Sequence, residues 1–264
     1  MISSQIVQPL AALGIPKSIL DDLPAISGSV SGMVVYGSRA RGDAVPGSDL
    51  DLLALVPFPS PTINIGDVSL SFYTSTQLES GAGTLFGAHL KRDAKVLFDR
   101  DGQLTSALSK MGEVDSSRVF RRALTMSQLF TTPERDLPRY LPGLLRQARY
   151  LLRSSLYAQS IARGSPCFSV REIAVRYEDL DLAQLLASRQ AAEPTLEDYL
   201  SCTSRLKNLL GDFPLSRHGS LEATLVNEWG SASDLLSMAF MALGSSGAGA
   251  GSGSDYAEVK KVLL

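Results

Sequence analysis

The sequence has little cysteine and little histidine. Its 264 residues include two of each, Cys167 and Cys202, and His89 and His218. The cysteines are too far apart for a C-x-x-C metal or redox pair, and a chain of this size does not depend on disulfides. We therefore expect two buried thiols in a reducing, cytoplasmic environment. Two histidines leave no room for a histidine-rich metal site or a Ser-His-Asp triad, so we expect both to be structural or solvent-facing.

Long hydrophobic runs are also missing. The most apolar late stretch, residues 235–243, is interrupted by Ser237 and is far shorter than the about 20 residues that a helix needs to cross a bilayer. Residues 1–16 contain no positively charged segment leading into an apolar run, so no secretory signal is expected. No Gly-Lys-Ser/Thr loop is present, which argues against a P-loop ATPase. We expect no membrane partner.

The charge is nearly balanced but unevenly distributed. A net charge of −2 excludes a polycation or an acidic tail as a description of the whole chain, and 44% hydrophobic residues suffice for a sizeable core. Residues 118–178 contain eleven arginines, no lysine and four acids, a net charge of +7, which leaves −9 for the remainder. Four arginines in this segment recur at helical spacing: Arg139, Arg146, Arg149 and Arg153. We expect them to bind a polyanionic acceptor, with pairing to internal acids as the alternative.

The chain is predicted to divide into an α/β half and a helical half. Short β-rich runs lie at 33–36, 50–56, 68–73 and 95–98, with helical patterns at 4–13 and 76–92. These features predict a small mixed sheet with helices in a domain spanning residues 1–108. Later in the chain the strand signals stop, and helices are expected at 136–164, 170–189, 195–210 and 221–243. Residues 109–243 are therefore predicted to form a helical bundle domain that binds substrate or a partner.

A Gly, Ser and Ala run at 244–254 is typical of a flexible linker. The short segment 255–264 follows it and can place Tyr256, Val259 and Val262 on one helical face. Such a short helix is marginal unless it packs against the body of the chain or a partner.

A small polar motif follows the first apolar run. Residues 33–36 lead into Gly37 and Ser38, where the missing Cβ of the glycine lets the backbone approach a ligand. The Ser38 hydroxyl and the N–H groups that follow can hold phosphate oxygens, and a helix beginning there adds a favourable field for an anion. This segment is therefore predicted to be a phosphate-binding turn.

Two aspartates mark the start of the next run. Asp49 and Asp51 are two residues apart in a β pattern, so both carboxylates project from one face while Leu50 and Leu52 pack on the other. Two carboxylates on one face suit Mg²⁺, which completes its shell with water and substrate phosphate. We expect a magnesium site beside the turn.

The turn and the diacid together form a longer pattern. Gly-Ser-Arg-Ala-Arg-Gly-Asp at 37–43 is followed by Ser-Asp-Leu-Asp-Leu-Leu at 48–53. The segment 34–56 thereby resembles the nucleotidyltransferases of the DNA polymerase β superfamily, in their minimal branch. The resemblance implies transfer of a nucleoside monophosphate from a nucleoside triphosphate to an acceptor hydroxyl, with two Mg²⁺ ions and release of pyrophosphate.

The same resemblance assigns roles to individual residues. It implies that Gly37 and Ser38 hold the β- and γ-phosphates and that both metals are bound by Asp49 and Asp51. Three further residues are expected on the nucleotide side: Arg39, Arg41 and Ser48. For the two arginines, a surface salt bridge is the alternative, since spacing alone does not fix their direction.

The sequence departs from the superfamily pattern at the third carboxylate, which in catalytic members sits on a neighbouring strand. The expected mid-strand position here is Ser69 or Ser71. Asp67 is on the same face but one step earlier, about 6.6 Å along the strand. We take Asp67 as the third catalytic residue, with a strand-capping turn as its alternative role. Asp93 is a poorer candidate, expected to be an exposed helical acid.

These features predict a Mg²⁺-dependent nucleotidyltransferase that uses a nucleoside triphosphate. Resembling enzymes modify partner proteins, the 3′ end of tRNA or aminoglycosides, often in toxin–antitoxin or phage-defence systems. The arginine-rich segment favours the macromolecular acceptors over an aminoglycoside. A second hypothesis is a catalytically impaired nucleotide-binding antitoxin or complex subunit, suggested by the missing mid-strand acid. Nothing in the sequence indicates an oligomeric state.

Overall fold

The computed structural model describes residues 3–186, 193–231 and 233–244. The chain separates into two compact units between Val114 and Asp115. This division falls a few residues beyond residue 108, because the helix at 103–109 packs on the sheet of the first unit through Leu104 and Ala107. Apart from residue 244, the expected linker at 244–254 and the segment 255–264 lie outside the described residues.

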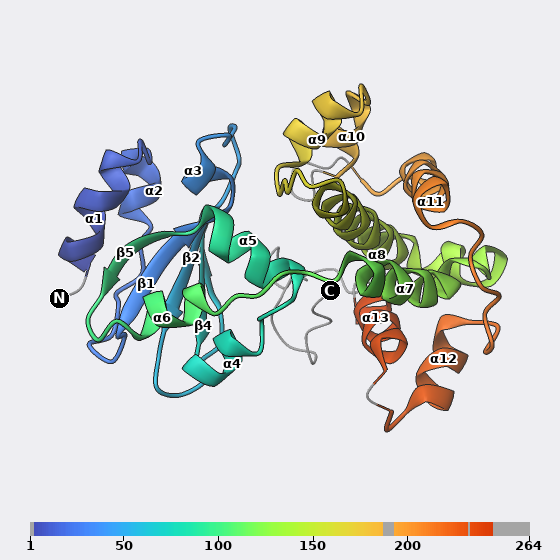
Figure 1. Ribbon diagram of the computed structural model, residues 1–264. Coiled ribbons are helices and arrows are strands. Elements are labelled where there is room, and N and C mark those ends of the chain that lie inside the picture. The colour runs from blue at the N-terminus through green and yellow to red at the C-terminus, as the bar shows by residue number, and fades with distance from the viewer. Residues whose placement is uncertain (1–2, 187–192, 232, 245–264) are drawn as a thin grey trace. The chain divides into compact units, whose positions relative to one another are not determined.

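The first unit is built on a five-stranded mixed sheet (Figure 1). Its strands are β1 (Gly32–Tyr36), β2 (Leu50–Leu55), β3 (Ile63–Ile65), β4 (Val68–Tyr73) and β5 (Lys95–Asp99). They lie in the order β3-β4-β2-β1-β5, with β2 and β4 parallel and the other pairs antiparallel. The α/β fold class is confirmed. The short edge strand β3 was not expected, since three residues carry too little alternation to be recognised.

Helices cover both faces of this sheet (Figure 1). They are α1 (Ser3–Ala12), α2 (Lys17–Asp21), α3 (Gly37–Arg41), α4 (Ser75–Glu79), α5 (Leu85–Asp93) and α6 (Gln103–Ser109). Alternation along β2 separates two cores, because Leu50 and Leu52 pack with α1 and α2 while Leu53 and Leu55 pack with α4, α5 and α6. The carboxylate of Asp51 therefore belongs to the second face.

The second unit is helical, as expected. It contains α7 (Ser116–Met126), the 3₁₀ turn η1 (Ser127–Phe130), α8 (Pro133–Ala162), α9 (Val170–Arg176), α10 (Asp181–Leu185), α11 (Leu196–Leu210), α12 (Leu221–Glu228) and α13 (Asp234–Leu243). Helix α8 bends at Tyr140, two residues before Pro142, whose ring and missing N–H disfavour a straight helix there. Helix α13 crosses α8 at Gly143, where a Cβ would lie 1.8 Å from the carbonyl oxygen of Ala242.

Three expected helices are each two helices in the structure. The pattern at 76–92 breaks between α4 and α5, where Thr84 caps α5 by accepting from the N–H of Gly87. The pattern at 170–189 breaks at Glu178, which has a φ of +54°, and its last residues, 187–189, lie outside the described residues. The pattern at 221–243 breaks near Gly230, which has a φ of +84°. No helix in the described part of the chain is long and apolar enough to span a membrane.

Candidate active site

The turn at Gly37 and the carboxylate of Asp51 lie in direct contact. Tyr36, the last residue of β1, pairs with Asp51 of β2, so the chain turns into α3 beside that carboxylate. Gly37 has a φ of +75°, and a Cβ built on it would lie 2.3 Å from Oδ2 of Asp51. Only glycine satisfies both the left-handed backbone and the space left by the carboxylate. Gly37 and Asp51, 14 residues apart in the sequence, thus lie side by side in the fold.

Parallel pairing with β4 decides which side chains stand beside the diacid. Asp51 pairs with Ser69, and the N–H of Leu50 donates to the carbonyl of Asp67 at 2.7 Å. Asp67 therefore lies next to Asp49 just before the ladder begins, with its side chain exposed, while a serine stands beside Asp51. Among the residues that the structure describes, no three His, Cys, Asp or Glu side chains are grouped so that they could hold a metal ion.

The donors present fit a single metal ion held by two carboxylates. Asp49 and Asp51 are both half-buried at the start of β2, and the glycine turn leaves room beside the second of them. Mg²⁺ is commonly held by one or two carboxylates and takes its other ligands from water and phosphate. The pair therefore suits a magnesium–triphosphate complex, whereas a second ion would need ligands from outside this pair.

Arg39 binds the loop that precedes the diacid. Its Nε and Nη2 atoms donate to the carbonyl oxygen of Ser48 at 3.0 and 2.6 Å. The hydroxyl of Ser48 in turn accepts from the N–H of Val45 at 2.9 Å. Both residues were expected to contact the nucleotide, and this contact stays a prediction. In the structure they hold the 42–49 loop, which precedes Asp49, against α3.

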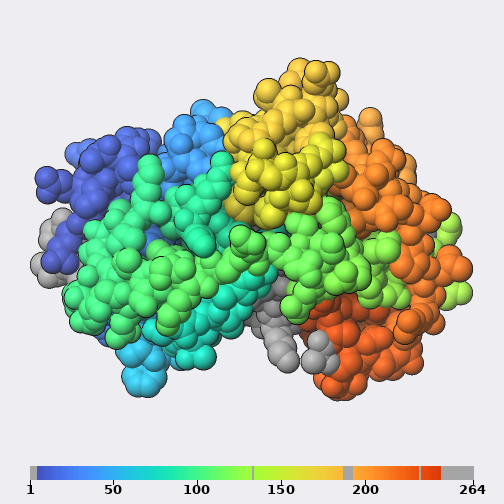
Figure 2. Space-filling view, viewed as in Figure 1, coloured from blue at the N-terminus to red at the C-terminus, as the bar shows by residue number. Residues whose placement is uncertain are grey.

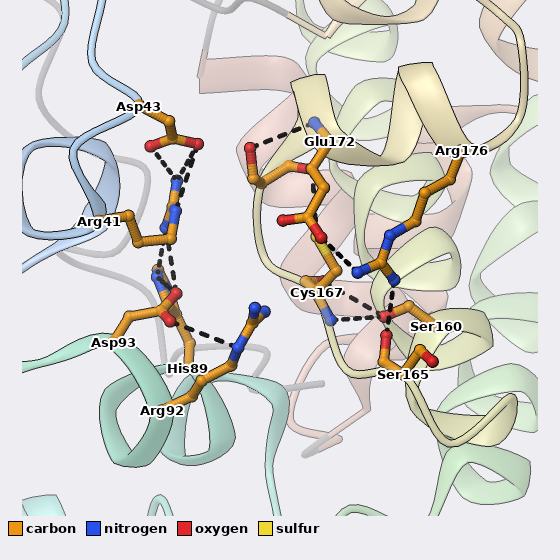
Figure 3. Close-up of polar contacts among 11 residues, drawn as sticks. Arg41, Asp43, His89, Arg92, Asp93, Ser160, Ser165, Cys167, Glu172 and Arg176 are labelled. Carbon is orange, nitrogen blue, oxygen red and sulfur yellow. Dashed lines mark hydrogen bonds and ion pairs between the residues drawn. The ribbon is translucent and has the colours of Figure 1, made fainter.

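Arg41 is enclosed by three side chains (Figure 3). Its Nη1 lies 3.1 Å from Nε2 of His89 and 3.3 Å from Oδ2 of Asp93, and its Nη2 lies 3.3 Å from Oδ1 of Asp43. Arg92 approaches the other Asp93 oxygen at 3.6 Å. Of the two roles considered for Arg41, the structure therefore shows the ion pair, and this pair joins α3 to α5.

Burial sets the protonation of this cluster. It lowers the pKa of His89 to about 3, with Arg41 and Arg92 adding to the effect. The neutral imidazole can accept the Arg41 proton at Nε2. Burial also raises the pKa of Asp93 above its usual range, against the opposing effect of Arg41. Asp93 was expected to be an exposed acid and is 9% exposed, because it lies against Arg41 of α3. His89 and Asp93 also lie 3.4 Å apart, and the one sequence signal for their contact is the i,i+4 spacing of the two residues on a helix.

The four arginines expected to bind an acceptor have different surroundings on α8. Arg149 is buried and donates to the carbonyl of Leu185 at 2.7 Å and to Asp198 at 3.1 Å. Arg153 donates to the carbonyl of Leu186 at 2.6 Å. Arg139 is exposed beside Glu222, and Arg146 is half-buried, with no ion-pair partner among the described residues. Arg149 and Arg153 thus join α8 to the helices around it.

Both cysteines are buried thiols, as expected. The N–H of Cys167 donates to the hydroxyl of Ser160 at 3.0 Å, and its thiol lies 3.5 Å from the carbonyl of Ser169 (Figure 3). Burial raises the pKa of Cys202 to about 12. The Cys202 thiol is therefore neutral and is not a reactive nucleophile.

Comparison with known proteins confirms the resemblance recognised from the motif. Residues 16–99 match the nucleotidyltransferase domain family, and this segment includes the turn, the diacid and the whole sheet. No curated protein sequence matches the chain.

Several solved structures are distantly similar, and two of them are described here. A toxin–antitoxin crystallised with AMP-PNP is 17% identical over 42% of this chain and 84% of its own, with a TM-score of 0.25. A nucleotidyltransferase-like protein from Exiguobacterium sibiricum 255-15 is 16% identical over 80% of this chain and 74% of its own, with a TM-score of 0.31. At these TM-scores neither likeness supports an argument about this chain.

Proposed function

We propose that this chain binds a magnesium–nucleoside triphosphate at the Gly37 turn and transfers the nucleoside monophosphate to a hydroxyl group. The observation that carries the proposal is the contact between the turn and Asp51, whose carboxylate occupies the space that a Cβ would fill. A phosphate-binding turn and a metal-binding carboxylate in contact are what a metal-bound triphosphate requires.

The chain's own residues would act by positioning. Gly37 and Ser38 would hold the terminal phosphates through backbone N–H groups and the serine hydroxyl, and Asp49 and Asp51 would hold the metal. When bound, Mg²⁺ would neutralise the triphosphate and its leaving group. The acceptor oxygen would form a bond to the α-phosphorus while the bond to the bridging oxygen breaks. Pyrophosphate would leave with that electron pair, and the hydroxyl proton would pass to Asp67 or to solvent.

A macromolecular acceptor, a partner protein or the 3′ end of tRNA, remains our proposal, with toxin–antitoxin or phage-defence systems as the setting. The net charge of the arginine-rich segment overstates the number of arginines available to bind an acceptor. Arg149 and Arg153 are used within the helical unit, so Arg139 and Arg146 are the two of the four that could meet a polyanion. An aminoglycoside acceptor needs neither of them.

Transfer can be tested with triphosphates labelled at the α-phosphate. The purified chain, Mg²⁺ and each labelled nucleotide are incubated with cell extract, with purified tRNA or with an aminoglycoside. We expect one class of acceptor to be labelled by the wild type and not by Asp49→Asn/Asp51→Asn. The control is Asp21→Asn/Asp101→Asn, which removes the same charge from outside the proposed site. Equal labelling by the wild type and the Asp49/Asp51 variant would refute the proposal.

The pairing of Ser69 with Asp51 supports a second candidate, a nucleotide-binding subunit with impaired catalysis. This candidate predicts triphosphate binding without release of pyrophosphate. Ser69→Asp would place a third carboxylate beside Asp51, and we expect it to raise transfer at least about tenfold if a general base is missing. If Asp67 already acts as the general base, Asp67→Asn abolishes transfer, and Ser69→Asp does not raise the rate of transfer above that of the wild type.

A further inference from the structure

The helix that carries the proposed phosphate-binding turn, α3, is short and buries little apolar surface. It has five residues, and Ala40 is its one buried side chain. A helix of this length does not hold its own shape in water, and a single methyl group gives it few packing contacts. Gly42, which ends α3, is solvent-exposed, and the loop that follows lies at the surface of the first unit (Figure 2, light blue, upper edge). The position of this end of α3 therefore depends on the polar contacts of Arg41.

His89 of α5 contacts the residues at both ends of the turn. Its ring lies edge-on to that of Tyr36, the last residue of β1, with centroids 5.9 Å apart. Its Nε2 lies 3.1 Å from Nη1 of Arg41, the last residue of α3 (Figure 3). Phe86, on the same face of α5, also packs edge-on against Tyr36, at 6.2 Å. Because the sheet fixes Tyr36, His89 ties the far end of α3 to the sheet.

The chemistry of the contact with Arg41 gives it a direction. A guanidinium can only donate hydrogen bonds, so a bond to Nε2 requires that this nitrogen carries no proton and that the ring proton is on Nδ1. Asp93, one turn further along α5, accepts from the same Nη1 at 3.3 Å, and Oδ1 of Asp43 lies 3.3 Å from Nη2 on the other side. The two acceptors on α5 come from one face of one helix, so together they fix Arg41 relative to α5.

We propose that His89 is a positioning residue for nucleotide binding: its ring rests on Tyr36, its Nε2 holds Arg41, and the turn at Gly37 and Ser38 is thereby kept ready to receive the triphosphate. The inference rests on the proposed function, which assigns this turn to phosphate. A turn that is in its competent conformation for only part of the time binds its ligand more weakly by that fraction. Loss of His89 should therefore raise the KM for the nucleotide and leave kcat unchanged.

Three substitutions separate the two contacts of His89. His89→Gln keeps an oxygen that can accept from Arg41 and loses the ring, His89→Phe keeps the ring and loses the acceptor, and His89→Ala loses both. We expect His89→Ala to raise the KM about tenfold, in the range of one hydrogen bond to a charged group, and the other two variants to restore part of the difference. Lys91→Ala, at an exposed position of the same helix, is the control and should match the wild type.

The division between KM and kcat distinguishes positioning from a purely structural role. If His89 only stabilised the fold, His89→Ala would lower the melting temperature and the active fraction, and so the apparent kcat, without raising the KM. An unchanged KM in a folded His89→Ala variant would overturn the proposal.

Hydrogen exchange in the chain without nucleotide tests the inference separately from the proposed function. The N–H groups of Gly42 and Asp43 both donate to the carbonyl of Ser38, at 2.9 and 3.1 Å, so their exchange reports the opening of α3. Followed by NMR, both should exchange at least about fivefold faster in His89→Ala, with the amides of β1 unchanged. Unchanged exchange at both would overturn the inference even if the chain binds nucleotide. Faster exchange in His89→Ala, in a chain whose wild type binds no triphosphate, would instead refute the proposed function.

Discussion

The arginines of the two units differ in what they hold in place. In the first unit, Arg39 donates to the carbonyl of Ser48, nine residues away, and so holds a loop beside the candidate active site. In the second unit, Arg149 and Arg153 donate to groups 33 to 49 residues away, on or beside other helices. Arg41 resembles this second pair, because it reaches Asp93, 52 residues away, and joins α3 to α5. The comparison therefore separates Arg39, which shapes a loop, from three arginines that join helices.

This comparison predicts that the largest effect on activity comes from the turn itself. Gly37→Ala adds a Cβ 2.3 Å from Oδ2 of Asp51 and forces alanine into a left-handed backbone. We expect transfer or triphosphate binding to fall at least about 100-fold, because displacement of reacting groups by about 1 Å has effects of this size. Gly42→Ala is the control, since Gly42 also has a positive φ but nothing within 4 Å of its Cβ position. Equal losses of transfer or binding in the two variants would show that backbone strain, and not the contact with Asp51, causes the effect.

The second prediction concerns stability in the helical unit. Arg149→Met leaves the carbonyl of Leu185 and the carboxylate of Asp198 without this donor, and we expect it to lower the free energy of unfolding by about 2–3 kcal/mol. Arg139→Met removes an exposed ion pair and should cost less than about 0.5 kcal/mol. Urea denaturation of both variants measures the difference. A similar decrease in the free energy of unfolding for both variants would contradict the distinction between arginines that join helices and arginines on the surface.

Arg39→Met tests the opposite side of the comparison. It frees the 42–49 loop from α3, and we expect about a tenfold fall in kcat/KM for the nucleotide with little change in melting temperature. Arg100→Met is matched to it, because Arg100 also donates to a backbone carbonyl, that of Gly28, outside the candidate site. A loss of stability without a loss of activity in Arg39→Met would show that Arg39 stabilises the fold, as proposed for Arg149 and Arg153, and does not position the active-site loop.

The smallest effect is a pH dependence from His89. Its ordinary pKa of 6.5 is lowered to about 3 in the folded chain, so between these values the unfolded chain binds a proton that the folded chain does not. This group therefore does not lower the free energy of unfolding above pH 6.5. As the pH decreases below 6.5, the free energy of unfolding decreases by up to about 1.4 kcal/mol per pH unit. The raised pKa of Asp93 acts in the opposite sense.

Comparison of the wild type with His89→Gln isolates this contribution, because Asp93 is present in both. Stability is measured by urea denaturation between pH 7 and 4, and the wild type should lose more of it than the variant on acidification. His218→Gln, in the other unit, is the control. Parallel profiles for the wild type and His89→Gln would show that His89 is not kept neutral by its surroundings.

Most of the elements that could be predicted from the sequence were predicted from short-range patterns. Alternation located β1, β2, β4 and β5, and the motif located the turn and the diacid, because both depend on neighbours in the chain. The partners of Arg41, Arg149 and Arg153 could not be predicted, since helical spacing fixes the face of a side chain but not the element packed against it. Asp93 was misjudged for the same reason: its burial depends on α3, about 50 residues earlier.

The central claim, a magnesium–triphosphate site at Gly37 and Asp51, is tested most directly by calorimetric titration of a non-hydrolysable nucleoside triphosphate into the full chain. The wild type should bind it in the presence of Mg²⁺ and at least tenfold more weakly with EDTA. Asp49→Asn/Asp51→Asn should lose the dependence on Mg²⁺. No binding by the wild type at millimolar nucleotide, or the same Mg²⁺-dependent affinity in the variant, would contradict the account.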